Sequence, residues 1–139
     1  MRQALTVLEV QARRRGLTDI TAKVREWVAR QDIRSGLLTV YCRHTSASLL
    51  IQENAAPAAR RDLERFFERL APEGEGIYEH DDEGPDDMPA HLKTALTQVQ
   101  VSVPLLDGQL MLGAWQGIHL FEHRTRPGMR EIVLHLAGE

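Results

Sequence analysis

The stretch Gln100-Val-Ser-Val-Pro-Leu-Leu-Asp-Gly-Gln-Leu110 decides the fold class of this 139-residue chain. Apolar and polar residues alternate from Gln100 to Leu105, which is the period of a strand with one face in a core. Asp107-Gly108 follows as a hairpin turn, because such turns favour these two residue types. The sequence therefore predicts antiparallel strand pairing in the C-terminal third of the chain.

Further strand signals follow this hairpin. They are a long apolar run from Leu110 to Phe121 interrupted by Trp115-Gln116-Gly117, a turn at Arg126-Pro127-Gly128, and a closing strand from Glu131 to Leu136. The glycines on either side of Trp115 indicate a bulge or a close backbone approach within a strand. A core position is favoured for Trp115 over stacking on a ligand.

The N-terminal half alternates strands with helices. Strands are predicted over Leu5 to Ala12, Leu37 to Arg43 and Ala47 to Gln52, the last two joined by a turn or a hairpin kink at His44-Thr45-Ser46. One helix follows Thr18-Asp19 with Ile20, Val24, Trp27 and Val28 on one face, and another runs from Pro57 to Pro72 with Leu63, Phe66, Phe67 and Leu70. We expect one α+β domain over residues 1–139: a mostly antiparallel sheet or sandwich of about six or more strands, with helices packed on one side.

Composition excludes several classes of protein. Hydrophobic content of 42% and a formal net charge of −3 are typical of a soluble globular protein and argue against nucleic acid as a partner. The clusters Arg13-Arg14-Arg15 and Arg60-Arg61 are interpreted as solvated surface. The single Cys42 lies in an apolar run and is interpreted as a buried, inert thiol. Without a membrane-length apolar run or a signal peptide, we expect no membrane partner and a cytoplasmic location.

The segment Gly84-Pro-Asp-Asp-Met-Pro-Ala-His-Leu-Lys93 concentrates groups that bind ligands. Pro89 suits the first position of a helix, with Asp87 or Met88 as N-cap, so that His91 and Lys93 project from the first turn, where anions are attracted. The preceding residues 73–88 hold eight acidic residues and no periodicity, as in a functional or mobile loop. A capped helix behind a solvated acidic loop is the alternative interpretation.

Three of the six histidines lie in such motifs. They are His44, His80 and His91, which on separate segments could converge on a divalent metal such as zinc. Alternatively, the imidazoles bind phosphate or act as general acid and base, with Asp86 or Asp87 fixing the tautomer. His119, His123 and His135 alternate with apolar residues or lie near a turn, and we expect them to be structural.

Several motifs together resemble the secondary thiamine-phosphate synthase (YjbQ-like) family. They are His44-Thr-Ser-Ala-Ser-Leu49, Glu53-Asn54, Asp86-Asp-Met-Pro-Ala-His-Leu-Lys93, Leu112-Gly-Ala-Trp-Gln-Gly-Ile118 with Glu122, Gly16-Leu-Thr-Asp-Ile20 and Arg130. In one departure, the chain has Ala56-Pro57 where the family tends to carry an Asp-Pro pair, which removes one carboxylate and leaves Asp62. The resemblance implies an α+β trimer with its pocket near the subunit interface. It also implies a weak ability to join a pyrimidine pyrophosphate to a thiazole phosphate.

The resemblance gives the remaining motif residues roles toward a small phosphorylated metabolite. His91, Asp87 and Lys93 would be catalytic, with His91 as acid or base and Lys93 binding the substrate's charge. The substrate-binding set implied is Thr45, Ser46, Glu53, Asn54, Trp115, Gln116, Gly117, Glu122 and Arg130. Among these, the hydroxyls would contact phosphate, the carboxylates could hold magnesium, and the Gln116 amide could bind a pyrimidine edge or satisfy a bulged backbone.

Two functional classes remain open on these residues. One is a low-turnover enzyme, either a transferase or a metal-assisted hydrolase, and the other is a non-catalytic module that binds a metal or phosphometabolite. No nucleotide-binding loop, dinucleotide fingerprint or triad spacing is present to decide between them.

Overall fold

Eight strands and three helices form the chain in a computed structural model that describes residues 1–139. The strands are β1 (Arg2–Gln11), β2 (Gly16–Asp19), β3 (Gly36–Cys42), β4 (Ala47–Glu53), β5 (Gln100–Leu106), β6 (Gln109–Leu110), β7 (Gln116–Glu122) and β8 (Met129–Gly138). The helices are α1 (Thr21–Ala29), α2 (Pro57–Leu70) and α3 (Asp87–Leu96).

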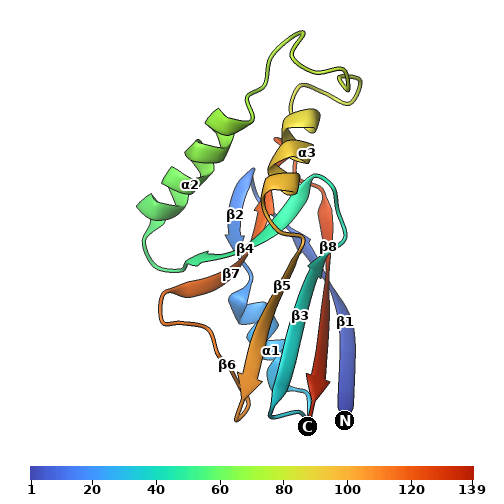
Figure 1. Cartoon of the computed structure of the whole chain (residues 1–139), viewed down its shortest axis with the longest axis vertical. Helices are drawn as coiled ribbons and strands as arrows, with labels where there is room; N and C mark the ends of the chain where they lie inside the picture. The colour runs from blue at the N-terminus through green and yellow to red at the C-terminus, as the bar shows by residue number, and fades with distance from the viewer.

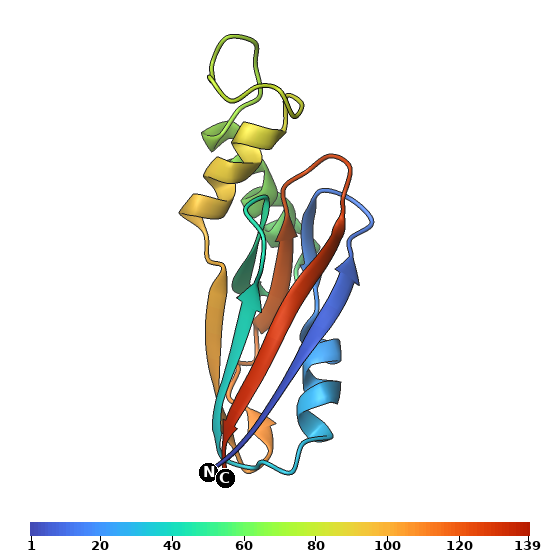
Figure 2. The same ribbon diagram turned by 90° about the vertical axis from the view of Figure 1, so that its right-hand side faces the viewer.

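The strands form two antiparallel sheets. A five-stranded sheet has the order β1-β8-β3-β5-β6, and a three-stranded sheet has the order β2-β7-β4. Figures 1 and 2 show long strands along the molecule with α2 and α3 gathered at one end, together with the loop that joins them. The α+β fold with mostly antiparallel strands is therefore confirmed.

The core lies between the two sheets. Alternation in β5 buries Val101, Val103 and Leu105, and α1 adds buried residues such as Val24 to the same cluster. The opposite face of the five-stranded sheet is exposed in the single chain and carries apolar side chains, namely Leu5, Val7, Leu37 and Tyr41. The helix side chains that join this core come from α1 and pack on the inner face of the larger sheet only.

The expected hairpin between the second and third predicted strands is wrong. β3 pairs with β5 and β8, whereas β4 pairs with β7 in the other sheet. Residues 44–46 therefore carry the chain from one sheet to the other. Local periodicity predicts both strands but contains no information on which distant strand pairs with each.

The C-terminal third contains both a confirmed turn and a corrected strand. Asp107 and Gly108 have φ angles of 51° and 77°, as a tight hairpin turn requires. The apolar run after Leu110, however, is not one strand, because residues 111–115 form a loop between β6 and β7. Trp115 lies in that loop and is 70% exposed, so the expected core position is wrong.

The helices around the site begin close to where the sequence predicts. α2 begins at Pro57 as predicted, whereas α3 begins at Asp87 with Asp86 as N-cap, so that Pro89 is its third residue rather than its first. The shift is tolerated because the N–H groups of the whole first turn lack intrahelical partners. No helix of the structure is both long enough and apolar enough to cross a membrane.

Candidate functional site

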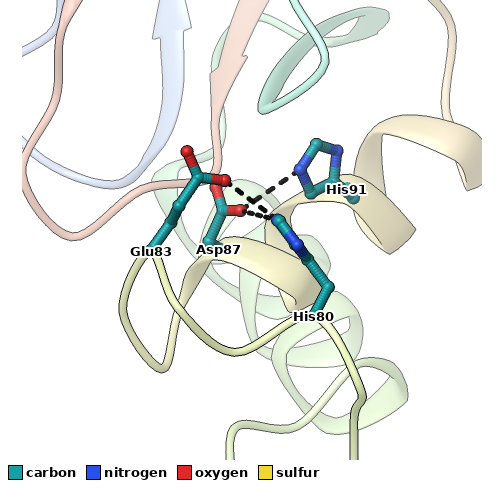
Figure 3. A group of neighbouring side chains, drawn as sticks. All are labelled: His80, Glu83, Asp87 and His91. Carbon is teal, nitrogen blue, oxygen red and sulfur yellow. Dashed lines mark hydrogen bonds and ion pairs between the residues drawn. The ribbon is translucent and has the colours of Figure 1, made fainter.

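Two imidazoles and two carboxylates meet where the long loop enters α3 (Figure 3). Nε2 of His80 lies 2.8 Å from Oδ2 of Asp87 and 2.9 Å from Oε2 of Glu83. Nε2 of His91 lies 3.2 Å from the same Asp87 oxygen, because positions 87 and 91 share one face of the helix. One potential ligand atom from each of the four residues lies within 4.8 Å of the others. We call these four residues the acid–imidazole cluster.

Arg124, two residues after the end of β7, fixes this cluster. Its Nη1 donates to Oδ1 of Asp87 at 2.6 Å, and its Nε donates to Oδ2 of Asp86 at 3.0 Å. Asp86 also accepts hydrogen bonds from the backbone N–H and the hydroxyl of Thr125. The start of α3 is thus held by an arginine, which leaves Oδ2 of Asp87 for the two imidazoles.

The charges of the cluster follow from these contacts. The hydrogen bond with Asp87 raises the pKa of His80, and the neighbouring Glu83 raises it further. Burial by itself would raise the pKa of Asp87, but the hydrogen bond with His80 and the charge of Arg124 outweigh it, so the pKa is lowered. Asp87 is therefore a buried, ionised acceptor that attracts cations.

His44 does not join the cluster, so the expected convergence of three histidines is corrected to two. Its Nε2 accepts the backbone N–H of Glu131 at 2.7 Å, which places the proton of the neutral ring on Nδ1. Burial lowers the pKa of His44, and the nearby charge of Arg130 lowers it further. A neutral ring with one nitrogen protonated and the other bonded to the backbone has no free nitrogen for a metal.

His44 and His91 instead line one cleft of about 950 Å³ between the residue 44–46 link and α3. Thr45, Ser46 and Thr94 add hydroxyl groups to its walls. His91 therefore belongs both to the acid–imidazole cluster and to the cleft. A ligand in the cleft could reach hydroxyls and an imidazole while lying next to the carboxylates.

Glu122 and Arg130 form a buried ion pair behind this cleft. The guanidinium donates to both carboxylate oxygens, at 2.8 and 2.6 Å, and also to Oγ of Ser46 at 3.1 Å. Glu122 has no exposed surface. In this chain Glu122 holds Arg130 against Ser46, and its expected contact with substrate stays a prediction.

The other expected substrate-binding residues lie at the far end of β4 and β7. Asn54 Nδ2 donates to the carbonyls of Ala114 and Gln116, and Oε1 of Gln116 accepts the N–H of Gly113. Glu53 accepts two backbone N–H groups of the turn that follows it, and Gly117 is buried within the pairing of β4 with β7. Seven residues of β4 separate this end from the cleft, about 20 Å at about 3.3 Å per residue.

Lys93 also lies away from the cleft. It points to the opposite side of α3, toward α2, where its side chain is only 4% exposed. Arg14 and Arg61 are exposed, as the interpretation of the arginine clusters as solvated surface expects, and with the half-buried Arg15 they line a pocket there. Cys42 is buried as expected, and burial raises the pKa of its thiol to about 11.

Comparison with known proteins places this arrangement in a family. The sequence profile described as UPF0047 protein YjbQ-like matches residues 6–139. The chain belongs to the YjbQ-like UPF0047 family. A UPF0047 protein of Synechocystis sp. is 45% identical over 138 residues, which are 99% of this chain and 94% of the relative.

Two further proteins resemble it closely. The UPF0047 protein YjbQ of Escherichia coli is 42% identical over 133 residues, 95% of this chain and 96% of the relative. The crystal structure of a hypothetical protein from Aeropyrum pernix has a TM-score of 0.89 at 31% identity, covering 98% of this chain and 99% of that one. The family name states no reaction, so function has to come from the site.

Some residues of this UPF0047 chain that build the site were not expected from its sequence. Glu83 joins the acid–imidazole cluster, and its three-residue spacing from His80 is the sequence feature that could have identified it. Arg124 carried no signal, because its partners Asp86 and Asp87 lie far away in the chain. His119 and His123 are fully buried, as the structural interpretation expects. His123 additionally bonds to the buried Ser48, at 2.9 Å from Nε2 to Oγ.

Proposed function

We propose that this UPF0047 protein is a metal-dependent enzyme of low turnover that joins a pyrimidine pyrophosphate to a thiazole phosphate, which forms thiamine phosphate. The observation that supports an enzyme is the position of His91, which belongs both to the acid–imidazole cluster and to the cleft. The choice of substrates rests on the family resemblance of the motifs, since the cleft itself supports only a small phosphorylated metabolite.

The acid–imidazole cluster fits a divalent cation. Two imidazole nitrogens and two carboxylate oxygens are the donor set of many zinc sites, and the carboxylates also suit magnesium. Nε2 of His80 and Nε2 of His91 both approach Oδ2 of Asp87. The N–H groups of the rings offset the negative charge of Asp87 there, as a bound cation would. A bound divalent ion would neutralise part of the negative charge of the pyrophosphate group.

The residues of the chain have separate tasks in this proposal. Thr45 and Ser46 donate hydroxyl hydrogen bonds to phosphate oxygens in the cleft, and Arg130 holds Ser46 in place. Nδ1 of His91, the ring nitrogen not in contact with Asp87, donates a proton to the departing pyrophosphate as the thiazole nitrogen takes its place on the pyrimidine group. Asp87 orients the His91 ring through the 3.2 Å contact with its Nε2.

The proposal includes a homotrimer whose site lies at the boundary between subunits. Within one chain, the cleft and the Glu53–Gln116 end are separated by the length of β4. In a cyclic trimer, each interface brings two different patches of neighbouring chains together. The exposed Trp115 of one chain would then close the cleft of the next. Motifs that lie apart in one chain would in this way form one site.

The test is the formation of thiamine phosphate from the two substrates by purified protein, with and without Mg²⁺ or Zn²⁺. We expect slow, metal-dependent formation, and we expect His91→Ala to lower turnover by about 10²–10⁴-fold, the usual contribution of a general acid or base. His135→Ala, on the outer sheet face beside Gln3, is the control and should leave turnover per folded molecule nearly unchanged.

Equal rates for wild type and His91→Ala above background would contradict the transferase assignment. A protein that binds metal at the cluster yet forms no product would instead be the non-catalytic binding module. Release of phosphate from either substrate without joining would identify a metal-assisted hydrolase.

A further inference from the structure

A second pocket, of about 550 Å³, lies on the side of α3 away from the cleft. It is bounded by α2, the start of β2 and the Lys93 side chain, and it shares no lining residue with the cleft. The cationic residues that line it are Arg14, Arg15, Arg61, Arg65, Arg69 and Lys93. We call it the basic pocket. Its only hydrophobic lining residue is Phe121.

The carboxylates of the basic pocket neutralise only part of this charge. Glu64 pairs with Arg14 at 3.1 Å, and Glu68 pairs with Arg15 at 3.0 Å. The three arginines of α2 that line the pocket, Arg61, Arg65 and Arg69, are spaced four residues apart and therefore lie on one helix face. Arg65 pairs with Asp62 at 3.7 Å, which leaves Arg61 and Arg69. Together with Lys93 they leave an excess of positive charge on the wall of the basic pocket.

Lys93 is a buried cation without a close partner. Its nearest carboxylate oxygen, on Glu68, lies at 4.0 Å, which is beyond hydrogen-bond distance. Burying an ammonium group is costly unless it is paired and hydrogen-bonded. An anion in the basic pocket would supply the missing acceptors.

His123 presents a second buried polar atom without a partner at the same pocket. Its Nε2 forms a hydrogen bond with Oγ of Ser48 at 2.9 Å. Burial lowers the pKa of His123 to about 3, so the ring is neutral. Its Nδ1 is buried and has no hydrogen-bond partner. An ammonium group without an acceptor and a ring nitrogen without a partner therefore lie beside one basic pocket.

We propose that the basic pocket binds inorganic pyrophosphate or a similarly compact polyphosphate, without a metal ion. Several uncompensated cations match a ligand with several negative charges, and guanidinium groups bind phosphate oxygens in pairs. With Phe121 as the only hydrophobic lining residue, the basic pocket offers little surface for a heterocyclic ring. The basic pocket is additional to the site of the proposed function. It shares no lining residue with the cleft, and binding there needs no metal ion.

Calorimetric titration of the protein with sodium pyrophosphate in EDTA at low ionic strength tests this site. We expect one pyrophosphate per chain and an affinity that falls as salt is added, because the cations are partly exposed. Lys93→Met, and separately the double variant Arg65→Gln with Arg69→Gln, should each weaken binding about tenfold or more. Arg30→Gln, at the residue that caps the C-terminus of α1, is the matched control, because that arginine pairs with Glu26 away from the pocket, and should bind like wild type.

Three results would overturn the proposal. The first is an absence of binding heat with pyrophosphate, and the second is unchanged affinity in the folded variants of the basic pocket. The third is equal or tighter binding of orthophosphate, which would remove the assignment to polyphosphates. If Lys93→Met fails to fold by circular dichroism, the exposed α2 double variant decides alone.

The experiment also separates this site from the proposed function. Binding that requires Mg²⁺ and disappears in Asp87→Asn would locate the ligand at the acid–imidazole cluster and exclude the basic pocket. Binding in EDTA that persists in Asp87→Asn would support the basic pocket whether or not the protein forms thiamine phosphate.

Discussion

His123 is an imidazole with no exposed surface, and its protonation is coupled to folding. Burial, with the charges of Lys93, Arg130 and Arg15, lowers its pKa from 6.5 to about 3. As pH falls below 6.5, the unfolded chain therefore takes up a proton at this position that the folded chain does not. The contribution to the free energy of unfolding is thus lost progressively as pH falls from 6.5 toward 3.

We predict a slope of about 1.4 kcal/mol per pH unit from His123 over the acidic part of this range. His123→Gln, whose amide can still meet Ser48, should flatten the wild-type dependence by that amount in urea unfolding from about pH 7 to about pH 5. His135→Ala removes an imidazole outside the core and serves as control. Parallel wild-type and His123→Gln curves would show that this ring titrates normally in the folded protein.

At the scale of single residues, the sequence located much of the cluster but not its partners. Asp87 and His91 could be placed together because their spacing puts them on one helix face. His44 was separated from them by a backbone N–H of Glu131, a contact that depends on sheet pairing and has no local signature. Arg124 is invisible for the same reason, since its ion pairs span a long stretch of chain.

At the scale of elements, β3 and β8 approach closely at a pair of glycines. Gly36 lies opposite Gly138, and a Cβ on Gly36 would overlap the carbonyl oxygen of Ala137. We predict that Gly36→Ala lowers the free energy of unfolding by about 1–3 kcal/mol, as other overpacked sites do. Gly128→Ala, with no atom within 4 Å of its new Cβ, should change it by less than about 0.5 kcal/mol in the same denaturation experiment.

A larger loss of unfolding free energy for Gly36→Ala than for Gly128→Ala would confirm that the backbone of Ala137 leaves no room for a side chain at position 36. Equal, small costs for both substitutions would show that the two strands can separate at their ends.

The elements themselves were largely predictable, but their assembly was not. Proline at position 57 and the apolar spacing of α2 fix that helix locally, and alternation fixes β5. The transfer of the chain between sheets at residues 44–46 depends on distant strands, which periodicity cannot identify. The four-residue spacing of the arginines at positions 61, 65 and 69 is visible in the sequence. Only the fold shows that Lys93 of α3 lies at the same pocket.

At the scale of the whole molecule, the proposed trimer predicts a mass near three times the 15.7 kDa of one chain in light scattering. The exposed apolar residues of the loop between β6 and β7, Met111 and Trp115, offer surface for such contacts. A species of single-chain mass at micromolar concentration would exclude the trimer.

A shared site predicts complementation between two inactive variants. If His91 of one chain works with Trp115 of the next, His91→Ala and Trp115→Ala should each be weak alone. Unfolded together in equal amounts and refolded, they should regain about a quarter of the wild-type sites, because neighbouring chains then combine at random. Activity no higher than the mean of the separate variants would place both residues in one chain's site.

The helix α3 carries Asp87 and His91 on one side and Lys93 on another, so two ligands would act on the same ten residues. Thermodynamic reciprocity then constrains them. Whatever factor a cation at the cluster imposes on pyrophosphate affinity at the basic pocket, pyrophosphate must impose the same factor on cation affinity. A cell's phosphate metabolism would thereby set the metal occupancy of this protein to the same degree that metal sets its response to pyrophosphate.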